Sequence, residues 1–353
     1  MSLFKNKVMK TLLFTLDYEL YGNGSGDVFK HIIEPTDKIL GIVEKYNAKL
    51  TIFFEVIEYW KLKEEWESGN RMGYDRNPIE AMERQLKRAF EYGHDIQLHL
   101  HPQWVDAFWT ENGWKVNLEK WRLGDYEGTG ENSLLCLLQR GKETIEKLLG
   151  NGYNCEVLRA GGYNVQPSDE LSSAMRLAGL RADSSIYPGG KENGFLSKYD
   201  YTGVKGDVGM WYCGNNLETS SNIKSDLIEL PIVAFPILRL QKYLSLDRVK
   251  SLLRNRKSAK DAFDAKIPKG RGGHISRLLY FFQKEAQTWD YCLFTKGMHR
   301  KFLKTIENQN DRSLFVLVGH PKSFVSSKGL EFLLKRKPSR FQYITISEYL
   351  KSL

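Results

Sequence analysis

The twelve residues GHDIQLHLHPQW, positions 93–104, decide how this chain folds. From the third of these residues onward, polar and apolar side chains alternate, which predicts a strand over 94–101. Side chains two residues apart on a strand point to the same face. His99 and His101 are therefore expected side by side, just where the strand ends. His94 begins the strand, so we expect it at the opposite end, in a structural role.

The chain on either side repeats this pattern of a short strand followed by a helical segment. Strands that alternate with helices are typical of βαβ units and a parallel sheet. Seven expected strands in 353 residues predict one α/β domain, residues 1–353, with a closed or nearly closed barrel. The expected strands cover 11–17, 49–56, 94–101, 155–162, 180–187, 227–233 and 314–321, and the expected helices cover about 36–46, 78–92, 133–149 and 168–178.

One segment, 238–310, interrupts the pattern before the last strand and is predicted to be a basic, mostly helical insertion. Between Arg239 and Arg277 twelve Lys and Arg residues face three Asp residues, an excess equal to the whole net charge of +9. The segment has few interleaved aromatic residues and no nucleic-acid-binding motif, so we expect no nucleic-acid partner. A solvated helical face, peripheral contact with an anionic membrane surface, and capture of a phosphate-linked glycan remain open.

The cysteines and the apolar segments indicate the compartment. Cys136, Cys155, Cys213 and Cys292 are scattered and form no CxxC pair, which is typical of a protein in a reducing compartment. The apolar run near the N-terminus is too short for the core of a signal peptide, and no apolar stretch reaches the length of a membrane span. We therefore expect a cytoplasmic protein. The sequence carries no indication of the oligomeric state.

Polar side chains stand at the carboxyl ends of several expected strands. The first strand ends in Asp17, with Glu19 two residues further on. The fourth strand carries Arg159, the fifth reaches Asp183, and the last ends in His320. In parallel α/β folds these strand ends meet at one edge, where active sites lie. The sequence therefore predicts one polar site that also includes the two histidines of the third strand.

The two imidazoles, His99 and His101, together with a carboxylate from the first strand suit a divalent metal. Three protein ligands with open positions for water are typical of a catalytic zinc site. Asp17 and Glu19 are both candidates for the oxygen ligand. Zinc is the first choice, and iron, cobalt or manganese also fit two imidazoles and one carboxylate. Two hydrogen-bonded histidines without a metal are the alternative interpretation.

Seven short motifs follow one another along the chain: TLDYE (15–19), LTIFF (50–54), GHDIQLHLH (93–101), LRAGGY (158–163), ADSSIYP (182–188), LIELP (227–231) and GHP (319–321). In this order they resemble the motifs of the polysaccharide deacetylase family, the group with chitooligosaccharide deacetylase homology. The resemblance covers about residues 11–233 and 313–350. It implies a deformed (β/α)7 barrel that removes N- or O-acetyl groups from sugars in a metal-dependent reaction.

The resemblance also implies a role for individual residues. Asp17 takes the place of the general base that activates metal-bound water, and Arg159 holds this carboxylate in its ionised form. His99 takes the place of the first ligand histidine. His320 takes the place of the general acid that protonates the leaving group. Asp183 either orients a neighbouring side chain or caps a turn.

Two positions depart from the family pattern. The family commonly has a second Asp directly after the first, and here that residue is Tyr18, so Glu19 is the nearest replacement ligand. The second ligand histidine usually lies four residues after the first, and here that position is Gln103, whereas His101 lies two residues after it. The site is either rearranged or has lost its metal. We favour a rearranged site, because two new candidate ligands appear where two are missing.

These observations predict a cytoplasmic, metal-dependent carbohydrate deacetylase that acts in surface polysaccharide biosynthesis. Its expected substrate is an acetylated sugar or glycan precursor, with or without a phosphate linkage. Tyr163, Trp104 and Glu229, which lie in or next to the motifs, are predicted to contact this substrate. The alternative from another class is a catalytically silent barrel that binds sugar.

Overall fold

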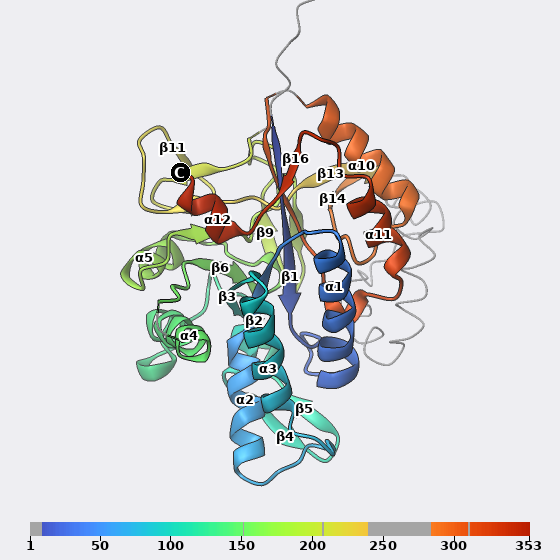
Figure 1. The fold of residues 1–353 in the computed structure, drawn as a ribbon. Coiled ribbons are helices and arrows are strands. Elements are labelled where there is room, and N and C mark those ends of the chain that lie inside the picture. Colours follow the sequence, from blue (N-terminus) through green and yellow to red (C-terminus); the bar gives the residue numbers. More distant parts are fainter. Residues whose placement is uncertain (1–8, 151, 207, 239–283, 310) are drawn as a thin grey trace, which may run out of the picture.

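The computed structural model describes residues 9–150, 152–206, 208–238, 284–309 and 311–353. The chain folds around one curled sheet, with helices packed along its outside (Figure 1). Seven parallel strands form the main part of this sheet: β1 (Lys10–Tyr18), β2 (Leu50–Glu55), β3 (Asp95–Leu100), β6 (Val157–Ala160), β7 (Ala182–Asp183), β12 (Ile228–Glu229) and β15 (Leu314–Leu317). Each lies within a strand expected from the sequence or exceeds it by one residue at either end.

The seven strands are arranged in the order β12-β7-β6-β3-β2-β1-β15, and every neighbouring pair is parallel. Ile232, just after β12, forms a parallel bridge with Val316 of β15, and the Val233 amide donates a 2.8 Å hydrogen bond to the Val316 carbonyl. These contacts bring the two edges of the curled sheet together. The prediction of a deformed (β/α)7 barrel is confirmed.

Several short strands extend this frame and were not expected from the sequence. β16 (Phe341–Tyr343) pairs with the start of β1, and β10 (Trp211–Cys213) and β11 (Ser220–Ser221) continue the sheet beyond β12 in antiparallel pairing. Two separate hairpins consist of β4 (Phe108–Thr110) with β5 (Gly113–Lys115) and of β8 (Lys191–Asn193) with β9 (Lys198–Asp200). Strands of two or three residues are too short to show a hydrophobic period.

The α-helices of the described residues are α1 (Glu34–Lys45), α2 (Val56–Glu67), α3 (Pro78–Glu91), α4 (Leu134–Leu149), α5 (Asp169–Leu177), α10 (Lys296–Asn308), α11 (Ser327–Lys335) and α12 (Ile346–Lys351). Four helices, α1, α3, α4 and α5, follow the expected starts and ends closely, and the other four had no expected bounds. α2 was missed because it begins directly after β2, without an intervening loop. The side chain of Glu55 caps it by accepting hydrogen bonds from the amides of Ile57 and Glu58.

The predicted insertion begins in a two-stranded antiparallel stem. β13 (Ala234–Leu238) pairs with β14 (Lys284–Thr288), and the basic segment 239–277 lies outside the described residues. After the stem, Asp290 forms a parallel bridge with Val318, directly beyond β15. The returning chain is therefore placed next to the strand end that carries His320.

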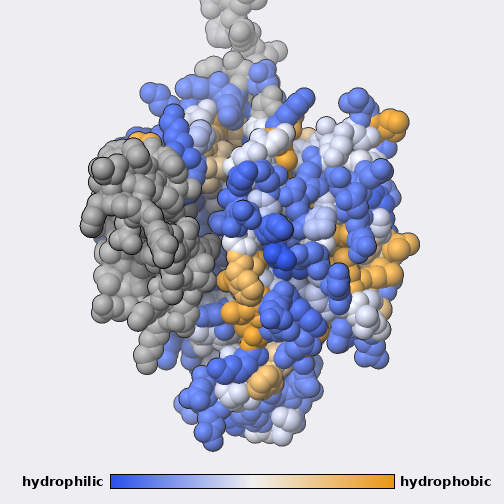
Figure 2. Space-filling model, turned by 180° about the vertical axis from the view of Figure 1, so that it is seen from behind, coloured by the Kyte–Doolittle hydropathy of each residue, from blue (hydrophilic) through white to orange (hydrophobic). Residues whose placement is uncertain are grey.

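Hydrophilic residues predominate on the face of the molecule seen in Figure 2, and the apolar residues there form small separate patches. Among the described helices, none is both long enough and apolar enough to cross a membrane.

Candidate active site

The site is organised by one face of β3. Asp95, Gln97, His99 and the following His101 alternate with leucines and an isoleucine and are all buried. Leu98 points the other way, toward Gly141 of α4. The four polar side chains therefore line the inside of the curled sheet, as the alternation of side chains along a strand requires. Asp95 stands at the amino end and His101 just beyond the carboxyl end.

His99 is held in the form that binds a metal. Its Nδ1 lies 2.7 Å from the backbone carbonyl oxygen of Arg159, the neighbouring strand's residue in register with it. A carbonyl oxygen only accepts hydrogen bonds, so Nδ1 carries the proton and Nε2 presents its lone pair. Nε2 is buried, has no hydrogen-bond partner among the described residues, and lies 3.7 Å from Oε2 of Glu19.

His101 faces the same carboxylate. Its Nε2 lies 2.7 Å from Oε2 of Glu19, without hydrogen-bond geometry, and the two imidazole rings lie 4.9 Å apart at nearly right angles. Burial lowers the pKa of His101, more than Glu19 raises it, so the ring is neutral. Gly161 makes room for this ring, because a Cβ there would lie 2.4–2.5 Å from its atoms.

Glu19 completes the cluster as an ionised carboxylate. Burial alone raises its pKa, but Lys322 and His101 outweigh burial and hold the pKa well below its usual range. Lys322 Nζ lies 2.9 Å from Oε1, the carboxylate oxygen that does not face the histidines. The remaining oxygen and the two imidazole Nε2 atoms all lie within 4.8 Å of one another.

These three donors fit a divalent metal. Two buried, unpartnered imidazole nitrogens and one ionised oxygen converge on a common point, and the donor set is the one that catalytic zinc sites use. The Glu19, His99 and His101 side chains would hold the ion. Glu19 also belongs to a second group of possible metal ligands, with Asp17 and His320. The choice of Asp17 or Glu19 as the oxygen ligand beside the two histidines therefore stays a prediction, and Glu19 is the carboxylate that faces them.

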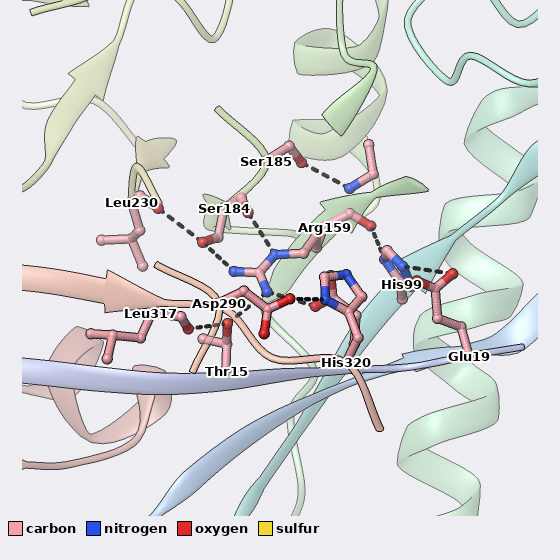
Figure 3. A network of polar contacts seen from close by, with 12 residues as sticks. Thr15, Glu19, His99, Arg159, Ser184, Ser185, Leu230, Asp290, Leu317 and His320 are labelled. Atoms are coloured by element: carbon pink, nitrogen blue, oxygen red, sulfur yellow. Dashed lines mark hydrogen bonds and ion pairs between the residues drawn. The ribbon is translucent and has the colours of Figure 1, made fainter. Parts of the chain in front are cut away.

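Asp17 belongs to a second, adjoining group of charges. Figure 3 shows two other members of this group, Arg159 and His320. Oδ1 of Asp17 accepts a 2.6 Å hydrogen bond from Nη1 of Arg159, which also contacts the Thr15 hydroxyl at 2.6 Å. Burial raises the pKa of Asp17, but Arg159 and the neighbouring histidines outweigh burial and lower it. The carboxylate is therefore ionised, and the structure places it beside the metal cluster rather than among its three donors.

His320 lies on the free side of this carboxylate. Its Nε2 is 3.5 Å from Oδ2 of Asp17, and its Nδ1 is 3.0 Å from Oδ2 of Asp290. Burial lowers the pKa of His320, but the two carboxylates, Asp290 first, outweigh burial and raise it. The ring is therefore poised to carry a proton next to Asp17.

Arg159 is fixed from the opposite side by the turn after β7. Its Nε donates to the Ser184 carbonyl at 2.7 Å, and its Nη2 donates to the Ser184 hydroxyl at 3.0 Å. Asp183 caps the same turn by accepting from the Ser185 amide at 2.9 Å and from the Ser185 hydroxyl at 2.8 Å. Of the two roles left open for Asp183, the structure shows the turn cap, and Asp183 has no contact with the acid–base pair.

The three residues predicted to contact a substrate lie in different surroundings. Trp104 is 1% exposed and packs edge-on against Trp114, so the structure places it in the core. Glu229 is fully buried beside Asp183, which is in register with it on the neighbouring strand. Neither presents a surface to a ligand. Tyr163 is partly exposed. Burial of its hydroxyl group, and after it the nearby charge of Asp17, raise the pKa of its phenol.

Two residues of the site escaped prediction from the sequence. Asp290, which orients His320, lies inside the predicted insertion and belongs to none of the recognised motifs. Lys322, which holds Glu19, follows the GHP motif by one residue. Proximity to that motif was the available signal for Lys322, whereas nothing in the sequence near Asp290 points to a histidine 30 residues away.

No protein-family model matches the sequence, and no curated protein matches it. Among solved structures, the chain is similar to a Mycobacterium smegmatis protein assigned as a polysaccharide deacetylase, with 12% identity, a TM-score of 0.50, and coverage of 100% of this chain and 92% of that chain. A Pseudomonas aeruginosa PAO1 protein with the same assignment has 12% identity and a TM-score of 0.46, with coverage of 97% and 89%. An allantoinase has 12% identity and a TM-score of 0.45, with coverage of 99% and 91%.

At 12% identity the likeness to the M. smegmatis structure establishes the fold and leaves the chemistry to the site itself. The M. smegmatis structure spans the whole of this chain. The fold is the one that the resemblance of the seven motifs implies. The chain has the fold of a polysaccharide deacetylase.

Proposed function

We propose that the chain hydrolyses acetyl groups of a carbohydrate, with a divalent metal held by Glu19, His99 and His101. The observation that carries this proposal is the convergence of two unpartnered imidazole nitrogens on an ionised carboxylate, directly beside a separate acid–base pair. A metal bound there lowers the pKa of a bound water and polarises a carbonyl oxygen. Zinc is the proposed ion, and iron, cobalt and manganese are the alternatives.

Asp17 is the proposed general base. Its carboxylate is ionised, because the buried guanidinium of Arg159 contacts Oδ1. Oδ2 is left to accept a proton from the attacking water. Arg159 cannot itself take up that proton, since a guanidinium stays charged at any working pH. The contact between Arg159 and Asp17 therefore fixes Oδ1 of the carboxylate and leaves Oδ2 to react.

His320 is the proposed general acid. Asp290 accepts a hydrogen bond from Nδ1–H and so turns Nε2–H toward Asp17 and the space beside it. A raised pKa keeps this proton available near neutral pH. The proton then passes from Nε2 to the leaving amine or alkoxide, while Asp290 stabilises the ring in its charged form.

The substrate and the compartment are parts of the same proposal. We propose an acetylated precursor of a surface polysaccharide, met in the cytoplasm. The four cysteines are all free, which supports a reducing compartment. The positive charge of segment 239–277 supports an anionic, phosphate-linked sugar or contact with a membrane surface. Two measurements test this part. The acetate-releasing activity of the soluble fraction of cells is compared with that of the membrane fraction, and the activity on neutral sugars is compared with that on phosphate-linked sugars.

Metal content and acetate release test the central claim together. We expect about one zinc per chain in the wild type and release of acetate from N-acetylglucosamine oligosaccharides. His99→Ala, His101→Ala and Glu19→Gln should each lose both. His94→Gln is the matched control, because His94 is a buried histidine at the other end of the same strand. It should keep both properties.

Two outcomes contradict the proposal in different ways. A wild type that binds no metal at micromolar free zinc removes the metal site. If that metal-free protein still binds the oligosaccharides without releasing acetate, the chain is the catalytically silent sugar-binding protein.

A further inference from the structure

The two histidines of the metal cluster differ in what holds their second nitrogen. Nδ1 of His99 faces the Arg159 carbonyl, which only accepts hydrogen bonds. Nδ1 of His101 faces the side-chain amide of Gln103, whose nitrogen is 2.8 Å away. An amide donates from one end and accepts from the other. The tautomer of His99 is therefore preset, whereas the tautomer of His101 depends on how this amide is turned.

Gln103 is built into the site. Its side chain is fully buried, and its amide nitrogen also donates to the Gly22 carbonyl at 3.2 Å. Its Oε1 is buried and has no hydrogen-bond partner among the described residues. Gly22 lies three residues after Glu19, so one amide contacts the loop that follows the oxygen ligand and the imidazole that faces that ligand.

In the arrangement with nitrogen toward Nδ1, the amide donates to the ring, and the His101 proton sits on Nε2. The nitrogen that carries this proton is the one that faces Oε2 of Glu19, 2.7 Å away and without hydrogen-bond geometry. An imidazole binds a metal through an unprotonated nitrogen. As a ligand, His101 must therefore carry its proton on Nδ1, and the atom opposite Nδ1 must be an acceptor.

The ring has little freedom to make this change by moving. His101 packs against Gly161 so closely that an added Cβ would lie 2.4–2.5 Å from three ring atoms. Trp121 lies edge-on to the same ring, with centroids 6.0 Å apart. A half-turn of the Gln103 amide needs no such space, because its oxygen and nitrogen are almost the same size.

We propose that Gln103 is a positioning residue that sets the tautomer of His101, and that metal binding is coupled to a half-turn of its amide. With Oε1 opposite Nδ1, the amide accepts the ring proton, and Nε2 of His101 is free beside Nε2 of His99. The half-turn gives up the hydrogen bond to Gly22. The metal-free and metal-bound sites then differ in one amide orientation and one proton position. This inference rests on the proposed metal site.

The substitution Gln103→Glu replaces the reversible amide by a group that accepts at both oxygens. It should favour the ligand tautomer and tighten zinc binding. Gln103→Met keeps the volume but removes the partner, and loss of such a partner weakens metal binding by about 10–100-fold. The measurement is the zinc dissociation constant by competition with a chromogenic chelator. Gln97→Met is the matched control. It removes another buried glutamine, on the face of β3 that carries His99, and should leave zinc affinity unchanged.

The imidazole 15N chemical shifts report the tautomer directly. In the metal-free wild type His101 should be protonated at Nε2, and after addition of zinc at Nδ1. In metal-free Gln103→Glu it should already be protonated at Nδ1. Wild-type protein with His101 protonated at Nδ1 in both states overturns the inference, even if Gln103→Met does not fold.

The outcomes separate this inference from the function it rests on. If the wild type and all variants bind no zinc, the metal site itself is wrong. If the wild type binds zinc and both Gln103 variants bind it with the same affinity, the metal site stands and the role of Gln103 is wrong.

Discussion

Both ends of strand β3 carry buried polar side chains, but the two ends differ in whether these side chains have hydrogen-bond partners. At the amino end Asp95 accepts hydrogen bonds from the Ser347 amide at 3.1 Å, the Ser347 hydroxyl at 2.9 Å and the Tyr153 hydroxyl at 2.9 Å. Gln97 accepts from the backbone amides of Glu156 and of Val157, at the start of β6, and donates to Asp95. This end is a closed network that ties α12 to the sheet.

At the carboxyl end two buried imidazole nitrogens have no hydrogen-bond partner among the described residues. Nε2 of His99 and Nε2 of His101 face Glu19 without hydrogen-bond geometry, although both are buried. A buried polar atom without a partner costs about 1–3 kcal/mol, so a protein keeps one where something else binds it. The comparison teaches that burial and polarity alone do not mark a functional site. Unsatisfied atoms that converge on one point do.

The sharpest test of the carboxyl end is Asp17→Asn. The variant keeps the shape of the side chain but removes the proton acceptor, and loss of such a group typically lowers the rate by about 10²–10⁴-fold. Acetate release should fall by that order. Zinc content should stay at the wild-type level if the ion sits between Glu19, His99 and His101, because Asp17 belongs only to the second possible group, with Glu19 and His320. A variant that loses zinc instead would show that Asp17 is a ligand.

Gly161→Ala tests whether His101 is a ligand without altering any polar group. The added Cβ forces the His101 ring from its place, since it would lie 2.4–2.5 Å from the ring atoms. Zinc affinity measured by chelator competition should fall by about 10–100-fold, the range seen when a ligand loses its support. Gly41→Ala in α1, where a Cβ has no atom within 4 Å, is the control. Unchanged zinc affinity in Gly161→Ala would exclude His101 from the site.

Asp95→Asn perturbs the amino end alone. The new amide group cannot accept all the hydrogen bonds that Ser347 and Tyr153 donate to the carboxylate. Leaving a buried donor unsatisfied lowers the free energy of unfolding by about 1–3 kcal/mol. Urea denaturation should show this loss, while zinc affinity stays at the wild-type value. A large drop in zinc affinity would mean that the two ends of β3 are coupled.

The remaining expected effect, which leaves the site at neutral pH unchanged, is a pH dependence from His94, which precedes β3. Burial lowers its pKa to about 4, and its Nδ1 accepts a hydrogen bond from the Leu50 amide. An unfolded histidine takes up a proton below about pH 6.5. The unfolded chain therefore binds more protons between pH 6.5 and 4, and stability falls as the pH is lowered through this range.

Urea midpoints of the wild type and His94→Gln across pH 4–7 measure this contribution. In that range the free energy of unfolding of the wild type should depend on pH more steeply than that of the variant, by up to about 1.4 kcal/mol per pH unit. Identical slopes would mean that His94 does not titrate in this way. His299 remains in both proteins, and its pKa, lowered by burial to about 3, adds the same background.

The sequence by itself determined the frame and most of the site. Strands alternate their side chains with a period of two, so His99 and His101 had to share a face with each other. Parallel strands end at one edge, so Asp17, Arg159 and His320 had to meet there. These are local rules, and each needed only a strand and its direction.

Only the tertiary structure decided which groups touch. Glu19 rather than Asp17 joins the histidines, because Arg159 reaches across from β6 and occupies Asp17. Asp290 meets His320 because the chain returning from the β13–β14 stem pairs beside β15. Such contacts depend on the closure of the barrel and on the path of an insertion.

The two ends of β3 show the same division. The alternation of polar residues along the strand is identical at both ends and predicts burial at each. Whether a buried atom is satisfied depends on what the rest of the fold brings against it. α12 brings donors to Asp95, whereas the chain after β1 brings to the histidines a carboxylate that shares no hydrogen bond with them. That difference, set by long-range packing, separates a structural network from a candidate metal site.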